Sequence, residues 1–151
     1  MATKTLVKTL HISSPAFDSG ESIPPKYTCD GEDISPALEI GELPEGTSTL
    51  ALIVEDPDAP RGNWTHWLMW DIPPTNLIEE NTSPGTEGTN DFGNTSYGGP
   101  CPPIGTHRYF FRVYALDIRT NLPHGSSREA FQVAMQNHII GSGELMGLYS
   151  H

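Results

Sequence analysis

The amino-acid sequence predicts an all-β protein, built as a two-sheet antiparallel β-sandwich with Greek-key connections and one helix in the C-terminal half. One observation is a series of short apolar and β-branched segments separated by turns, in a chain with 15 glycines and 14 prolines. A second is the lack of repeated strand–helix alternation, which an α/β fold would need. The length of 151 residues fits one domain, residues 1–151, with a substantial buried core.

Strands are expected where apolar and β-branched residues alternate or run together. The segment 109–117 is apolar on nearly both faces, so we expect it to be central in its sheet and covered on both sides. The stretch from 72 to 94 is rich in Pro, Thr, Asn and Gly, which indicates a surface connection. The predicted strands are residues 5–12, 37–40, 49–54, 66–72, 109–117 and 144–149.

One helix is predicted over about 127–139. The tetrapeptide Ser126-Ser127-Arg128-Glu129 fits a capping box, in which a serine and a glutamate satisfy the first free N–H groups. Apolar residues then recur at helical spacing. The sequence Gly141-Ser142-Gly143 is expected to stop the helix before the final strand.

Composition excludes several classes of protein. The net charge of -11, with only eight Lys and Arg residues, argues against nucleic acid as a partner. No segment approaches the roughly 18 to 20 apolar residues of a membrane span. The N-terminus has no signal-peptide pattern, so we expect a cytoplasmic protein. In such a reducing compartment Cys29 and Cys101 are expected to be free thiols, with a single bridge between them as the alternative.

Polar side chains lie at the ends of three predicted strands. Asp56 follows the strand that begins at residue 49, His66 begins the next one, and His107 precedes the segment 109–117. Successive strand residues point to opposite faces, so each polar residue can be grouped with apolar neighbours. If those faces line one core, the three polar side chains converge at its rim. Alternation groups Asp56 with Leu50, Leu52 and Val54, His66 with Leu68, Trp70 and Ile72, and His107 with Tyr109, Phe111 and Val113.

These residues leave several chemistries open. A metal site of His66 and His107 with Asp56 or Asp58 lacks the i, i+2 or i+4 spacing of short metal motifs. The segment 93–98 does not match a nucleophile elbow, which weakens a serine hydrolase. Glycosidase work by Asp56 and Asp58 is restricted by the proline between them. Purely structural roles, a turn for Asp56 and hydrogen-bonded imidazoles for the histidines, stay open as well.

A small anion pocket suits these residue types better. Imidazole N–H groups, tyrosine hydroxyls and backbone N–H groups freed in glycine-rich turns all donate hydrogen bonds to phosphate oxygens. An aspartate beside a histidine favours the donating, charged form of the imidazole. Proline rings and Trp64 would supply rigid apolar walls.

Three segments resemble the signature motifs of the phosphatidylethanolamine-binding protein family, also called the Raf kinase inhibitor protein family. They are Asp-Pro-Asp-Ala-Pro at 56–60, His-Trp at 66–67, and Gly-Gly-Pro-Cys-Pro-Pro with Thr-His-Arg-Tyr within 98–109. Residues 27–36 and 144–149 are similar to the short bacterial and archaeal branch. The likeness covers essentially the whole chain.

The resemblance implies the two-sheet fold of that family, with an anion pocket at one end and without cofactor or metal. Relatives bind phosphoryl groups, and some inhibit kinases or serine proteases. We therefore expect a non-enzymatic binding module for phosphorylated small molecules, head groups or phosphoproteins, with inhibition of a kinase or serine protease as a further expected role. The alternative is a hydrolase of a phosphorylated small molecule with a histidine as acid or base. The implied ligand-binding positions are Asp56, Pro60, His66, Pro102, His107 and Tyr109, with Trp64, Gly99, Pro100 and Cys101 in a secondary role.

Animal members of that family carry a C-terminal helix beside the pocket, which has no counterpart after Tyr149 here. The apolar surface that this helix would cover is expected to be polar or to be buried by a second copy of the chain. Leu145, Met146 and Leu148 are the candidates for such a homodimer interface.

Overall fold

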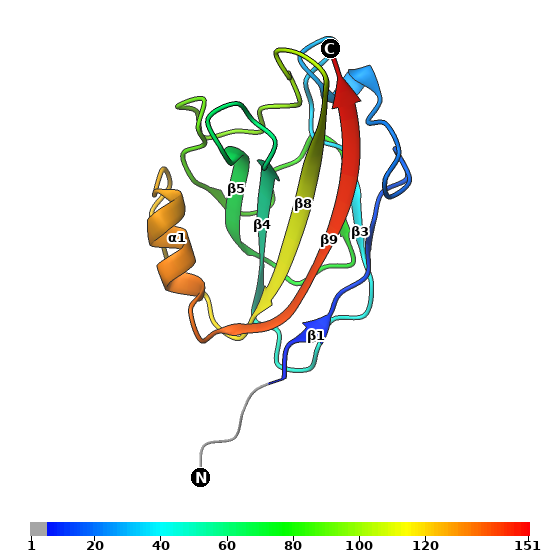
Figure 1. Cartoon of the computed structure of the whole chain (residues 1–151). Coiled ribbons are helices and arrows are strands. Elements are labelled where there is room, and N and C mark those ends of the chain that lie inside the picture. The colour runs from blue at the N-terminus through cyan, green and yellow to red at the C-terminus, as the bar shows by residue number, and fades with distance from the viewer. Residues whose placement is uncertain (1–5) are drawn as a thin grey trace.

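The structure is a computed structural model, which describes residues 6–151. It is mostly β, with one α-helix among the described residues (Figure 1). The elements in chain order are β1 (Lys8–Thr9), β2 (Ile12–Ser13), the 3₁₀ turn η1 (Pro25–Tyr27), β3 (Leu38–Ile40), β4 (Thr49–Asp56), β5 (Trp64–Ile72), β6 (Leu77–Ile78), β7 (Thr86–Glu87), β8 (Thr106–Leu116), α1 (Arg128–Met135) and β9 (Ile139–Ser150).

The strands form two sheets. The larger has the order β1-β9-β8-β4-β5-β7 and the smaller has the order β2-β3-β6. Among the named strands of the described residues, β1 pairs with β9 in parallel and the other ladders are antiparallel. Figure 1 shows β5, β4, β8 and β9 side by side, with the C-terminus at the same end of the sheet as the start of β8. The mostly β, two-sheet prediction is confirmed, whereas the Greek-key connections stay a prediction.

Each face of the larger sheet has its own apolar core. One core contains residues of both sheets, including Leu52, Phe111 and Leu38. The other lies under α1 and contains Trp70 and Phe131, whose rings pack with centroids 4.9 Å apart. Every residue of β4 is therefore buried, as expected for a strand covered on both faces.

The strand predicted to be covered on both sides, 109–117, fulfils only half of that expectation. It is central in the sheet, as β8, but its buried residues alternate with partly exposed ones. The outward face carries Arg112, which binds Glu55 on β4 and Glu144 on β9. Tyr114 and Leu116 at the end of β8 join the core under α1, so the ion-pair cluster occupies only the earlier part of the outward face of β8.

Both ends of the helix differ from the prediction. Ser127, not Ser126, is the N-cap, and its hydroxyl accepts the Ala130 N–H. The helix ends at Met135, and Asn137 then adopts a left-handed φ of 66°. Gly141 and Gly143, which were expected to stop the helix, lie inside β9. A Cβ at Gly143 would lie 2.0 Å from the Leu10 carbonyl oxygen, so glycine lets the chain beside β1 approach β9 closely.

The proposed dimer residues do not share one environment. Leu145 belongs to the core between the sheets and is 1% exposed, so it cannot form an interface with a second copy. Met146 and Leu148 are partly exposed. The pattern follows from strand alternation along β9, which turns Leu145 inward and its neighbours outward.

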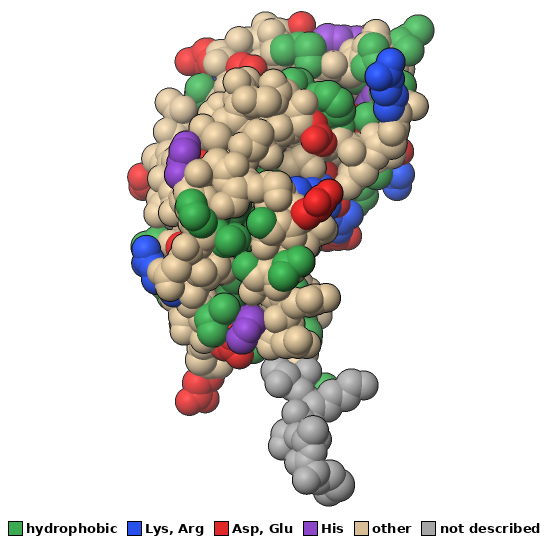
Figure 2. Space-filling model, turned by 90° about the vertical axis from the view of Figure 1, so that its left-hand side faces the viewer, with side chains coloured by type: hydrophobic (Ala, Val, Ile, Leu, Met, Phe, Trp, Pro, Cys, Tyr) green, Lys and Arg blue, Asp and Glu red, His purple; other side chains and the backbone are tan. Residues whose placement is uncertain are grey.

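No helix in the described part of the chain is long and apolar enough to cross a membrane. Figure 2 shows the face of the molecule that carries α1, where Lys and Arg side chains lie at separate points among acidic ones. A continuous basic surface, the usual footprint of nucleic-acid binding, does not occur on this face.

Two β-bulges interrupt the pairing of β5 with β4. Val54 pairs with Trp67 but Glu55 pairs with Thr65, which leaves His66 as an extra residue on β5. A second irregularity lies between Met69 and Ile72, where Asp71 has a left-handed φ of 54°. The Asp71 carboxylate accepts the Thr120 N–H at 2.7 Å, the Thr120 hydroxyl at 3.0 Å and the Asn121 N–H at 2.9 Å. Asp71 therefore fixes the connection that follows β8 to the C-terminal end of β5.

Asp71→Ala should lower the free energy of unfolding by about 2 to 4 kcal/mol. It leaves two backbone N–H groups without their charged acceptor and places an alanine at positive φ. Asp71→Asn should cost less, because asparagine tolerates positive φ and keeps one acceptor oxygen. Urea denaturation measures both losses, and a loss below about 1 kcal/mol in Asp71→Ala would show that the carboxylate contacts contribute little.

Candidate functional site

A pocket of about 190 Å³ lies at the end of the larger sheet where β4 ends and β5 and β8 begin. Antiparallel pairing brings these strand ends together, because the end of β4 lies beside the starts of both of its neighbours. The connection before β8 forms one wall. The lining residues are Asp56, Ala59, Pro60, Trp64, His66, Phe92, Cys101, Pro102, Pro103, His107 and Tyr109.

Most of the positions predicted from the sequence therefore line one cavity. All six primary positions do so, as do Trp64 and Cys101 of the secondary set. Gly99 and Pro100 do not line it. Gly99 instead packs behind the wall, where its N–H donates to Asp33 at 2.8 Å and a Cβ would lie 2.3 Å from the same carboxylate.

Ala59, Phe92 and Pro103 line the pocket but were not among the predicted positions, and of these Phe92 alone lies outside the recognised motifs. Phe92 lies in the connection interpreted as a surface segment. Its ring packs edge-on with Trp64 and with His66, with ring centroids 5.5 and 5.2 Å apart. The segment is held there by Asp91, whose carboxylate accepts the Thr65 N–H at 2.6 Å. An aromatic residue in an otherwise polar connection was the only available signal.

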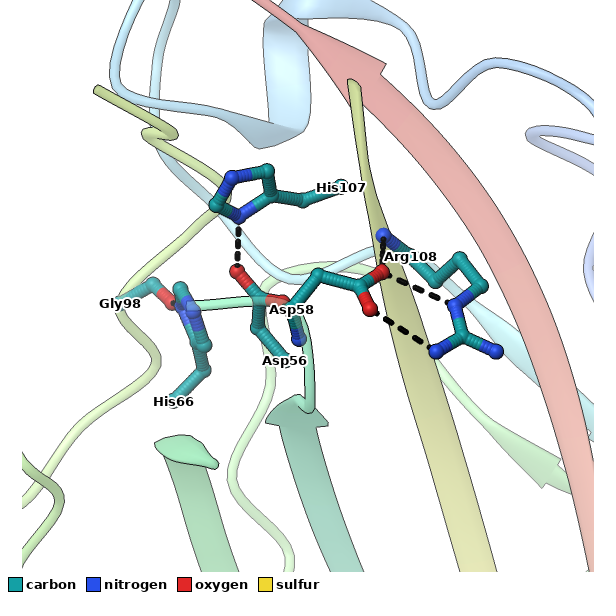
Figure 3. Close-up of polar contacts among 6 residues, drawn as sticks. All are labelled: Asp56, Asp58, His66, Gly98, His107 and Arg108. Carbon is teal, nitrogen blue, oxygen red and sulfur yellow. Dashed lines mark hydrogen bonds and ion pairs between the residues drawn. The ribbon is translucent and has the colours of Figure 1, made fainter. Parts of the chain in front are cut away.

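Asp56 and His107 form a buried pair at the floor of the pocket (Figure 3). His107 Nδ1 lies 2.6 Å from Asp56 Oδ2, and the other carboxylate oxygen accepts the Asp58 N–H at 2.7 Å. Both oxygens of Asp56 therefore have partners. Because a carboxylate accepts hydrogen bonds, Nδ1 carries the proton and Nε2 is left for the pocket.

His66 reaches the pocket through the bulge rather than through simple alternation. The extra residue places His66 and Trp67 on the same face, toward the core between the sheets, while Leu68 and Trp70 face α1. The predicted grouping of His66 with Leu68 and Trp70 was therefore wrong, although the convergence with Asp56 was right. His66 Nδ1 donates to the Gly98 carbonyl at 2.6 Å.

Burial lowers the pKa of His66 below its ordinary 6.5, and this effect outweighs the Gly98 carbonyl and the charge of Asp56, which both raise it. The imidazole is enclosed by the rings of Phe92 and Tyr109, with centroids at 5.2 and 5.3 Å. His66 therefore stays neutral to a lower pH than an exposed histidine, with Nε2 as a hydrogen-bond acceptor.

Tyr109 carries the one buried side-chain polar atom that has no hydrogen-bond partner among the described residues, its hydroxyl oxygen. Burial is the first cause that raises the pKa of Tyr109, and the charge of the Asp56 carboxylate and a long hydrogen bond to it add to this effect, while the backbone N–H of Cys101 acts in the opposite direction. The phenol is therefore protonated throughout the physiological range. Its enclosed O–H lies beside the pocket and makes no hydrogen bond of ordinary geometry, which is rare for a buried polar group.

Asp58 faces away from the pocket, although it lies only two residues after Asp56. Arg108 donates from Nε and from a terminal nitrogen to the two Asp58 oxygens, at 2.9 and 2.8 Å (Figure 3). These hydrogen bonds lower the pKa of Asp58 to about 2. Asp58 and Arg108 thus neutralise each other at the surface, outside the lining of the pocket.

The expectation of free thiols was wrong. Cys29 and Cys101 form a disulfide with Cα atoms 5.5 Å apart, which joins residues separated by 72 positions. The expectation relied on a presumed reducing compartment, which the sequence does not establish. The bridge fixes the wall that carries Cys101 to the segment after η1, where the Cys29 N–H also donates to the Pro100 carbonyl at 3.2 Å.

The metal hypothesis finds no support in the pocket. In the part of the chain that the structure describes, the one group of three ligand atoms within 4.8 Å of one another belongs to Cys29, Asp30 and His151. The sulfur of Cys29 is already bonded in the disulfide. His66, His107 and Asp56 therefore do not converge at metal-ligand distances.

The fold and the site define a class of mostly β proteins with two sheets, one helix and a strand-end pocket that holds two histidines and an aspartate. The family model described as phosphatidylethanolamine-binding protein matches residues 13–150. The chain belongs to the phosphatidylethanolamine-binding protein family, as its motifs suggested.

Relatives are found in archaea and bacteria. A UPF0098 protein of Archaeoglobus fulgidus is 49% identical over 97% of this chain, which spans 53% of that relative's length. A UPF0098 protein of Methanothermobacter thermautotrophicus is 45% identical over 93% of this chain and 98% of its own length. The chain thus spans about half of one relative and nearly all of another.

Two crystal structures are similar to this fold. A putative phosphatidylethanolamine-binding protein homologue of Chlamydia trachomatis, CT736, has a TM-score of 0.91 and 38% identity, covering 95% of this chain and 99% of its own. YbcL of E. coli, described as a new member of the mammalian family, has a TM-score of 0.86 and 28% identity, covering 94% and 98%.

The lowered pKa of His66 predicts a pH dependence of stability. Below pH 6.5 the unfolded state takes up a proton more readily than the folded state, so the free energy of unfolding should fall from pH 6.5 down to the lowered pKa. Above pH 6.5 this contribution is complete. Urea denaturation as a function of pH, compared with His66→Gln, isolates it. A wild-type curve parallel to that of the variant across this window would contradict the assignment.

Reduction of the disulfide should lower the free energy of unfolding by about 2 to 4 kcal/mol, because the bridge limits the unfolded chain across a long loop. The measurement is urea denaturation with and without a thiol reductant. The double variant Cys29→Ser, Cys101→Ser is the control, since its urea midpoint should be the same with and without the reductant. Wild-type protein that keeps its midpoint in reductant would show that the bridge adds no stability.

Proposed function

We propose that this protein is a binding module that holds a small phosphoryl-bearing anion in the pocket at the end of the larger sheet. The ligands we expect are phosphorylated small molecules, head groups or phosphoproteins. The observation that carries this proposal is the buried hydroxyl of Tyr109, a donor beside the pocket that makes no hydrogen bond of ordinary geometry with a described residue, although the Asp56 carboxylate lies near it. A phosphoryl oxygen is an acceptor of the right kind.

The size and walls of the pocket support a small group rather than a whole lipid. Its volume of about 190 Å³ is below the roughly 300 to 1,000 Å³ of pockets for drug-sized molecules. Proline and aromatic rings form most of the walls, and these groups exclude water without moving. A phosphoryl group with a short attachment fits this space, and the rest of its carrier would stay outside.

The hydrolase alternative receives no specific support. Among the described residues that line the pocket there is no serine or threonine, and the Cys101 sulfur is bonded to Cys29. An acid or base alone, without a nucleophile, leaves water as the attacking group. Inhibition of a kinase or a protease, a homodimer and a cytoplasmic location stay predictions from the sequence.

Tyr109→Phe tests the proposal because its two effects have opposite signs. It removes a buried hydroxyl without a partner, so the free energy of unfolding should stay the same or rise by about 1 kcal/mol. It also removes a donor, so the affinity for a phosphomonoester such as phosphoethanolamine should fall about tenfold. Urea denaturation and calorimetric titration measure the two effects.

Tyr97→Phe is the matched control. The Tyr97 hydroxyl donates to the Tyr27 carbonyl at 2.7 Å, away from the pocket lining. This variant should lose about 1 kcal/mol of stability and keep its affinity. A Tyr109→Phe variant that is destabilised but binds as tightly as wild type would mean that the hydroxyl has a structural role, and the proposal would lose its support.

A further inference from the structure

We infer that anion binding in this pocket is coupled to the uptake of one proton by His107. The inference rests on the proposed function, since it concerns how the same pocket accepts an anion. It assigns the proton to Nε2 of one imidazole. The consequence is a binding module that loads at lower pH and releases at higher pH.

The hydrogen bonds of the two histidines set the polarity of the pocket. In each of them Nδ1 is used as a donor, toward Gly98 in His66 and toward Asp56 in His107. No described residue makes a hydrogen bond to either Nε2 atom, and neither is among the fully enclosed unpaired atoms. In the neutral form both Nε2 atoms therefore offer a lone pair, which an anion cannot use.

The charge of the pocket points the same way. Asp56 is the only Asp, Glu, Lys or Arg residue among the lining residues. With neutral imidazoles an anion would meet one negative charge, two lone pairs and two uncharged side-chain donors, the Tyr109 hydroxyl and the Trp64 indole N–H. A proton on Nε2 removes one lone pair, adds a charged donor and cancels the charge of Asp56.

His107 is a better site for that proton than His66. His107 Nδ1 lies 2.6 Å from a carboxylate, and a buried carboxylate at this distance stabilises an imidazolium. His66 Nδ1 faces a neutral carbonyl, and two aromatic rings enclose its imidazole. The lowered pKa of His66 agrees with this difference.

The other charged and titratable groups around His107 do not supply the missing positive charge. Asp58 acts on His107 but is paired with Arg108. Tyr109 stacks on its ring at 6.4 Å, and Tyr149 lies opposite it in the ladder of β8 and β9. The Tyr149 hydroxyl donates to Asp30, which also pairs with His151. Arg108 and His151, the two basic groups in this set, therefore each have an acidic partner.

Phenyl sulfate is the probe that tests the inference, because it is a monoanion without a proton to contribute near neutral pH. Calorimetric titration between pH 7 and 8.5, in two phosphate-free buffers of different ionisation enthalpy, counts the protons taken up. We expect proton uptake approaching one as the pH rises, and an affinity that falls with rising pH by at most about tenfold per pH unit. Phenyl phosphate is titrated in parallel.

Two variants locate the proton. His107→Gln replaces the imidazole by a neutral amide, whose N–H donates a hydrogen bond without taking up a proton. Proton uptake on binding should therefore vanish, and the affinity should become independent of pH. His138→Gln is the matched control, since His138 Nδ1 forms a similar pair with Asp117 Oδ1, at 2.8 Å, on the surface outside the pocket. Its uptake should equal that of wild type.

The outcomes separate the inference from the proposed function. Binding without proton uptake, or uptake that persists in His107→Gln, overturns the inference and leaves the anion pocket in place. Binding of phenyl phosphate alone puts the proton on the ligand, which also overturns it. Failure of both probes to bind at any pH down to 5 removes the proposed function itself.

Discussion

The hydrogen bond between Asp56 and His107 depends on the pairing of β4 with β8, and the rest of the site depends on that bond. Asp56 is the last residue of β4, and His107 is the second of β8, so the antiparallel ladder brings them together across 51 positions of sequence. The bond fixes the tautomer of His107 and holds a carboxylate at the pocket without leaving it unpaired. The tightly buried strands behind it keep this geometry rigid, because both faces of β4 are covered.

Strand alternation was sufficient to predict part of the site. It placed Asp56 and His107 on the face that the structure assigns to the core between the sheets. It failed for His66, because a β-bulge adds one residue and reverses the faces beyond it, and nothing in the local sequence reveals the extra residue. The motifs that carry the family resemblance grouped His66 with the other residues that line the pocket, and such motifs do not depend on the local register.

Other differences have separate physical causes. The disulfide was missed because two distant cysteines carry no pairing information, and the decision fell to an assumption about compartment. The end of α1 was misplaced because glycines that serve close strand packing in β9 have the same appearance as helix stops. Phe92 was missed because a long polar connection gives no periodic pattern from which to read a direction.

The position of the disulfide allows part of the site to form before the chain is complete. The ring that it closes runs from Cys29 to Cys101 and includes β4 and β5, but neither β8 nor β9. The contacts that bring 97–101 to 27–33, such as those of Tyr97 with Tyr27 and of Gly99 with Asp33, use only residues that precede β8. One wall of the pocket can therefore be covalently complete before the ribosome has released the strand that carries His107.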